Sequence, residues 1–254
     1  MSAIALPLRP LRQRMLVAWA IALVLGTGAF KLAAWTAASL PRPSGLEELA
    51  YYPSGDHLAP ATLGHAETAA DLAWLRAVQY YGEHRQHDNR FAHLYHVFDI
   101  LTSLAPTFES AYVFGAFALA QEGQDFAHAE QLILKGLAAN PRSGRLAFEA
   151  GFLYFIKPNG RDLPHAAEYF ELASRLPGAP PAARQFAAFA HQNSGGIAVA
   201  YLLWKQVREN TANTYLRDIA QREMNKIQEA LASGRLDAVR AHLPVPRVRV
   251  DHSR

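Results

Sequence analysis

The sequence predicts an all-α fold: an α-solenoid of about four helix pairs, closed by a C-terminal capping helix and preceded by one transmembrane helix. Three observations predict it. Leu and Ala dominate while runs of Val, Ile or Thr are scarce, which disfavours β-sheet. An uncharged apolar run stands near the N-terminus, and a triplet of residues recurs through the middle of the chain.

The N-terminus predicts a membrane segment. Residues 1–14 are basic, the following run from Met15 to Phe30 carries no charge, and a second apolar stretch reaches residue 40. A bilayer core needs about 20 helical residues, which 15–40 supplies if Lys31 extends its ammonium group towards the headgroups. Basic residues before the span predict a cytoplasmic N-terminus, so the rest of the chain is expected outside the cytoplasm, in the periplasm.

The alternative for this segment is a cleaved signal peptide. Small residues at Ala37, Ala38 and Ser39 would suit a cleavage site. We favour a retained single-pass anchor because the apolar stretch is longer than the hydrophobic region of most signal peptides.

Residues 41–64 are rich in Pro, Gly and polar residues, which predicts a linker or an ordered loop. The first helix is expected over Ala66–Gly82, followed by a loop at 84–89 and a helix from Phe91 to Leu104. The predicted buried face of the first helix consists of apolar residues three apart: Leu72, Leu75, Val78 and Tyr81.

The recurring triplet predicts helix pairs. Its first residues, Ala129, Ala166 and Ala200, lie 37 and 34 positions apart, and a related triplet begins 35 positions before Ala129. The triplets are Leu94, Phe98 and Leu101; Ala129, Ile133 and Gly136; Ala166, Phe170 and Ala173; and Ala200, Trp204 and Val207. A small residue lets two helices approach closely, and the larger residues fill the space between them.

Pairs are therefore expected within 111–141, 146–177 and 182–210, and the repeat domain within 65–232. The helix Thr214–Ala232 has one charged side, as a cap for the last exposed interface should have. Residues 233–254 read as a flexible basic tail, either a solubilising terminus or a contact for an anionic partner.

On these residues, the stretches 112–141, 148–177 and 186–207 resemble tetratricopeptide repeats. The resemblance implies a right-handed superhelix whose concave groove, lined by the first helix of each pair, binds peptides or protein surfaces. An anchor followed by such an array looks like membrane-tethered bacterial scaffold proteins of assembly and secretion systems. The chain departs from chaperone-binding members, because no column of Lys and Asn recurs on its first helices.

If the first helices line a groove, some of their residues are candidate partner contacts. The polar candidates are Arg145, Glu149, Arg184 and Gln185. Tyr112 is the aromatic candidate, but aromatic residues at helical spacing equally suit the core between repeats.

The histidines near the first helix pair are the strongest feature with chemical potential. His93 and His96 lie three apart on an expected helix, and His84 and His87 border the expected loop. Such pairs can bind zinc or another borderline metal if two helices bring them together. The alternative is that they are exposed histidines at helix ends, since no HExxH arrangement is present.

Composition and motifs argue against other classes of function. The chain has no Cys, so disulfides and thiolate metal sites are excluded. A net charge of +3 with interspersed acidic residues disfavours a nucleic-acid surface. Serine-nucleophile elbows, phosphate-binding glycine loops and dinucleotide fingerprints are absent from the sequence, so we expect neither an enzyme nor a cofactor.

Two functions remain from the sequence. The first is a membrane-anchored scaffold or adaptor that mediates protein–protein interaction in an envelope assembly or secretion system. The alternative is a regulatory helical-repeat module that binds a ligand or metal at the histidines of 84–96. The sequence leaves the partner and the oligomeric state open.

Overall fold

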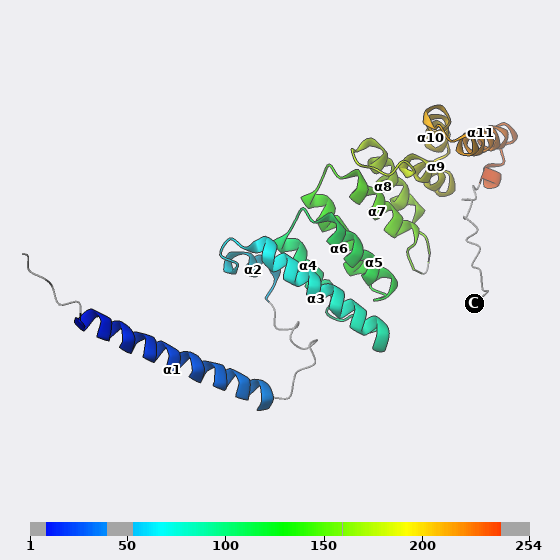
Figure 1. Ribbon diagram of the computed structural model, residues 1–254. Helices are drawn as coiled ribbons and strands as arrows, with labels where there is room; N and C mark the ends of the chain where they lie inside the picture. The colour runs from blue at the N-terminus through cyan, green and yellow to red at the C-terminus, as the bar shows by residue number, and fades with distance from the viewer. Residues whose placement is uncertain (1–8, 40–52, 159, 240–254) are drawn as a thin grey trace, which may run out of the picture. The chain divides into compact units, whose positions relative to one another are not determined.

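The computed structural model describes residues 9–39, 53–158 and 160–239, and all regular structure in these ranges is helical (Figure 1). The predicted all-α class is therefore confirmed. The chain divides into two units, one ending at Tyr51 and the other starting at Tyr52, and each is described by itself. The expected basic tail beyond 239, the first eight residues and most of the expected linker lie outside the described residues.

The first unit contains the helix α1, Arg9–Ser39. Its segment Met15–Leu32 is the one part of the described chain that is long and apolar enough to cross a membrane. Large apolar side chains such as Leu16, Trp19 and Leu23 are all exposed on it. A helix that is apolar all round suits a lipid environment.

The second unit is a succession of helices joined by short turns. Their bounds are α2, Gly55–Ala61; α3, Ala66–His87; α4, Leu94–Leu104; α5, Glu109–Gln121; α6, Phe126–Ala139; α7, Gly144–Phe155; α8, Leu163–Arg175; α9, Ala183–Ser194; α10, Ile197–Asn210; and α11, Thr214–Ser233, followed by the 3₁₀ helix η2, Leu236–Val239. These bounds agree closely with the helices expected from 91 to 232.

Neighbouring helices pack as antiparallel pairs. Contacts join α3 to α4, α5 to α6, α7 to α8 and α9 to α10, and α5 also touches α7. Every member of the four recurring triplets is buried: Leu94, Phe98, Leu101, Ala129, Ile133, Gly136, Ala166, Phe170, Ala173, Ala200, Trp204 and Val207. The recurrence in the sequence therefore marks the face that each second helix turns to the core.

Glycines at three helix crossings explain why the helices lie so close. A Cβ added at Gly136 would stand 2.7 Å from Cγ of Tyr112. One added at Gly115 would stand 2.6 Å from Cγ of Phe98, and one at Gly151 2.7 Å from Cδ1 of Phe170. At these points the ring of one helix occupies the volume that a side chain of the other would need.

The first helix pair differs from the expectation in two ways. Helix α3 continues to His87, so most of the expected loop at 84–89 is helical. Its buried residues are Ala70, Ala77, Tyr80 and His84, not the predicted aliphatic face. Leu72 is 61% exposed, Leu75 57% and Val78 40%. The reason is that α4 packs on the side of α3 that carries the small residues Ala70 and Ala77. The expected linker also contains α2, which packs on α4.

The C-terminal end of the described fold is formed by α11 and η2. Helix α11 buries Ile219, Ala220, Met224, Ile227 and Ala230, and it packs on α10. The ordered domain extends past the expected boundary at 232, because η2 contacts α11 and Val239 is buried. Residues 233–239 are therefore part of the folded domain.

Candidate functional site: an aromatic groove between the first helices

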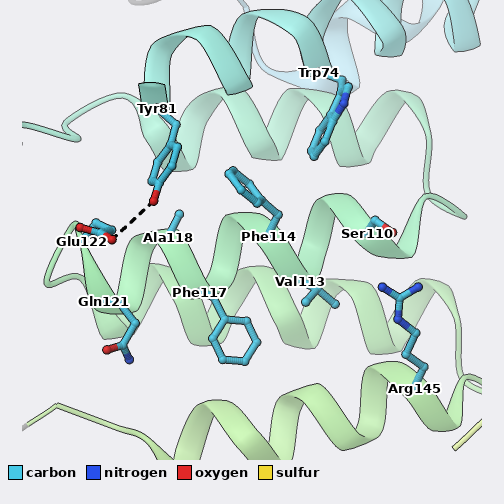
Figure 2. Close-up of a pocket in the computed structure, with 10 residues that line it drawn as sticks. All are labelled: Trp74, Tyr81, Ser110, Val113, Phe114, Phe117, Ala118, Gln121, Glu122 and Arg145. Carbon is cyan, nitrogen blue, oxygen red and sulfur yellow. Dashed lines mark hydrogen bonds between the residues drawn. The ribbon is translucent and has the colours of Figure 1, made fainter. Parts of the chain in front are cut away.

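A groove lies between α3 and α5, the first helices of two successive pairs (Figure 2). Its volume is about 530 Å³. Ten residues line it: Trp74, Tyr81, Ser110, Val113, Phe114, Phe117, Ala118, Gln121, Glu122 and Arg145. Helix α5 contributes most of them, and the start of α7 contributes Arg145.

The wall of the groove is a set of aromatic rings that hold each other in place. Phe114 lies between Trp74 and Tyr81, with ring centroids 5.7 Å and 5.1 Å apart and both contacts edge-to-face. Trp74 also meets Phe108 at 5.3 Å, again edge-to-face. Such contacts are favourable beyond the area they bury, so the wall is pre-formed. The groove offers a binding partner apolar surface with little ordering cost.

The aromatic surface continues along the first helices. Phe117 on α5 meets Phe152 on α7 at 6.0 Å, and Phe152 meets Phe186 on α9 at 6.1 Å. All three side chains are half-buried. A row of partly accessible rings therefore joins α5, α7 and α9, next to the groove.

The two ends of the groove differ in charge. At one end the carboxylate of Glu122 accepts a hydrogen bond from the hydroxyl of Tyr81 at 3.4 Å. The same carboxylate forms an ion pair with Nη1 of Arg85 at 2.5 Å. At the other end Arg145 is exposed and forms no hydrogen bond or ion pair within the described part of the chain. The carboxylate has a close ion-pair partner, whereas the guanidinium has none among the described residues.

Arg145 also lines a second cavity of about 610 Å³, at the turns before α7 and before α9. Its lining includes the exposed Arg142, together with Glu109 and the helix-capping Ser143. The amide of Gly144 donates to the carbonyl of Pro177 at 2.9 Å, which ties the two turns together. One arginine thus belongs to both the aromatic groove and a polar cavity.

Glu149 lies one helical turn beyond Arg145 on α7. Burial raises the pKa of its carboxyl group, and the nearby charge of Arg145 partly opposes that rise. The carboxylate is therefore held at an energetic cost, a pattern that is common at functional positions.

The structure separates the other two polar candidates from the groove. Arg184 and Gln185 begin α9 and line a different cavity of about 440 Å³, together with the turn between α10 and α11. Nε of Arg184 is buried and has no hydrogen-bond partner among the described residues. The four polar candidates therefore do not form one site.

Tyr112 does not face a groove. Its side chain is fully buried, it packs against Gly136, and its hydroxyl donates to the carbonyls of Thr102 and Pro106, both at 3.2 Å. It has no surface to offer a partner and belongs to the core between pairs, which was the alternative for the aromatic residues.

The histidines near α3 are engaged separately. Nδ1 of His84 lies 2.5 Å from the carboxylate of Asp88, and its buried ring packs against Tyr80. His87 contacts the carbonyl of Glu83, and the amide of His93 donates to the hydroxyl of Tyr80. Within the described ranges, neither these histidines nor His96 belongs to a group of three or more His, Asp or Glu residues placed to hold a metal ion.

Most of the groove was not predicted from the sequence. Trp74, Phe114 and Val113 had no assigned role, and Tyr81 was expected in a buried face. The available signal was the aromatic enrichment of the first helices, but half-buried and fully buried rings have the same spacing along a helix.

Comparisons with known proteins add no relative: no family model, curated protein or solved structure matches the chain. The groove itself is therefore the feature that indicates a function. Apolar rings beside one exposed guanidinium are suited to holding a segment of another molecule.

Proposed function

We propose that this chain is a membrane-anchored adaptor of the tetratricopeptide-repeat type, which holds a segment of a partner protein in the groove between α3 and α5. The observation that carries the proposal is the pre-formed aromatic wall of Trp74, Phe114 and Tyr81 at an open surface. Aromatic side chains are enriched at the centres of protein interfaces, where they supply much of the binding energy.

The arrangement of the helices supports this type of array. Four antiparallel pairs follow one another, the recurring triplets are buried at the crossings, and α11 covers the last pair. In such an array the first helices line the surface that meets partners. The groove and the row Phe117, Phe152 and Phe186 all belong to first helices.

The apolar helix α1 supports a location at the membrane. We propose that it is a retained anchor, with the basic residues before it in the cytoplasm and the repeat domain in the periplasm. Tethering would raise the effective concentration of the groove near envelope partners, so moderate affinity would suffice for assembly.

Site-specific crosslinking tests the proposal. A photoreactive phenylalanine analogue at Val113 in the groove, in the full-length chain in its own host membrane, should crosslink to one reproducible protein. The same analogue at the exposed Tyr215 of α11 is the matched control and should not capture that protein.

A second variant links the capture to the groove. Phe117→Gln keeps a side chain of moderate size at a half-buried position but removes its ring, and it should abolish the Val113 crosslink. A melting curve close to that of the parent chain would show that the domain remains folded. Capture that persists in this variant, or equal capture from both positions, would count against the groove as the binding surface.

A further inference from the structure

We infer that the segment bound in the groove is an apolar peptide stretch of a partner protein, flanked by Asp or Glu side chains on the side of Arg145. This inference rests on the proposed function and names the chemistry of the partner. It comes from the unequal charge of the two ends of the groove.

At the Glu122 end, the carboxylate already has Arg85 as its counter-ion and Tyr81 as a hydrogen-bond donor. A basic residue of a partner would have to compete with these groups. At the other end, neither Arg145 nor Arg142 has a hydrogen bond or ion pair to the described residues. An acidic residue of a partner would meet two exposed guanidinium groups that form no ion pair within the described residues.

The start of α7 adds to this positive potential. Arg145 is the second residue of a helix of 12 residues, whose N-terminus carries partial positive charge. The cavity around it contains two arginines and one carboxylate, that of Glu109. Glu149 lies within the electrostatic range of Arg145, but both it and Glu109 are half-buried, whereas Arg142 and Arg145 are exposed. The charge that a partner can reach at this end is therefore mainly positive.

The two cavities favour a peptide over a small anion. They share Arg145, so one extended segment can place apolar side chains in the aromatic groove and carboxylates in the adjoining cavity. A groove of about 530 Å³ accommodates more than one apolar side chain. The volumes of the two adjoining cavities therefore fit several consecutive residues.

Acidic side chains fit this surface better than a terminal carboxylate does. Arg142 and Arg145 place two exposed guanidinium groups at an open cavity of about 610 Å³. A chain end supplies one carboxylate, whereas an acidic run supplies one for each arginine. The occupant is therefore an internal apolar–acidic segment.

The test uses the full-length chain in lipid nanodiscs and a library of random dodecapeptides. The library is displayed in two formats, one with the peptide C-terminus fused to the carrier and one with the C-terminus free. The parent chain should enrich apolar peptides with adjacent Asp or Glu in the fused format. The variant Arg142→Gln with Arg145→Gln should still enrich apolar peptides but without the acidic residues.

Affinities of one enriched peptide, synthesised with an amidated C-terminus, give the size of the effect. The double variant should raise its Kd about threefold to tenfold, the scale of two partly exposed ion pairs. Added salt should weaken binding to the parent chain more than to the variant. Arg222→Gln on α11 is the matched control, an exposed arginine away from both cavities, and should leave Kd unchanged.

The remaining outcomes of the peptide selection separate failure of the inference from failure of the proposed function. Enrichment without an acidic preference, or a preference that survives in the double variant, overturns the inference and leaves the peptide-binding function standing. Enrichment only in the format with a free C-terminus also overturns the inference and leaves the peptide-binding function standing. It would identify a terminal carboxylate as the group bound by the arginines. Failure to enrich peptides in either format overturns the proposed function together with the inference.

Discussion

The indole N–H of Trp204 on α10 donates to the side-chain oxygen of Gln192 on α9, with the two atoms 2.6 Å apart in the core. The amide nitrogen of Gln192 donates to the carboxylate of Glu223 on α11 at 2.8 Å and to the carbonyl of Val239 at 2.6 Å. One buried glutamine therefore joins the last pair, the capping helix and η2. The cap is held by directional bonds as well as by apolar contact.

Replacement of this glutamine should loosen the C-terminal cap. Gln192→Leu would leave the indole N–H of Trp204 and the carbonyl of Val239 without their partner. We expect a loss of about 1–3 kcal/mol in the free energy of unfolding. Urea denaturation measures it, and faster amide exchange in residues 236–239 would locate it.

Gln228→Leu is the control, because that exposed glutamine bonds only to the hydroxyl of Tyr201 in the described structure. It should change stability by less than about 0.5 kcal/mol. Equal losses in the two variants would contradict the special role of Gln192.

Close packing at Gly136 gives a second prediction. Gly136→Val would drive its side chain into the ring of Tyr112 and should cost on the order of 1–3 kcal/mol from overpacking. Thermal melting of the fragment from residue 41 onward measures the loss. Ala173→Leu, at the matching place in the next triplet, should act in the same direction.

Gly82 is the matched control for this prediction. It lies inside α3 with no heavy atom within 4 Å of an added Cβ, so Gly82→Ala should stabilise the helix by about 0.5–1 kcal/mol. An unchanged midpoint for Gly136→Val would contradict the packing described here.

Glu149 should make stability depend on pH. Because burial raises its pKa in the folded state, the folded chain keeps this proton to higher pH than the unfolded chain does. Stability should therefore fall as pH rises from the ordinary pKa of the group to its raised value. Glu149→Gln should remove that fall and melt at higher temperature than the parent chain at pH 7, but not at acidic pH.

The measurement is a set of melting curves from pH 4 upward for both chains. Glu168→Gln on the exposed side of α8 is the control and should follow the parent curve. A constant difference between the Glu149 variant and the parent chain at every pH would show that the carboxyl group is not the cause.

Retention of α1 is open to direct measurement. The intact mass of the protein from host membranes should include residues 1–39, and alkaline washing should leave it in the membrane pellet. A mature chain that begins after Ser39 would establish a cleaved signal peptide instead.

The helices and their core positions were predictable because helical periodicity is a local property of the sequence. The bounds of α5 to α11 and the burial of the recurring triplets follow from residue spacing, Gly and Pro turns, and small residues at the crossings. The apolar character of Met15–Leu32 is likewise a property of its own residues.

Which apolar face meets a neighbour was decided only by tertiary packing. Helix α3 has two possible faces, and α4 covers the one with Ala70 and Ala77 while Leu72 and Leu75 stay exposed. Tyr112 is buried and Phe114 is half-buried although both lie on α5, because their directions around the helix differ. The groove brings together residues of α3, α5 and α7 that are up to 71 positions apart, from Trp74 to Arg145. Spacing along one helix holds no information about such contacts between helices.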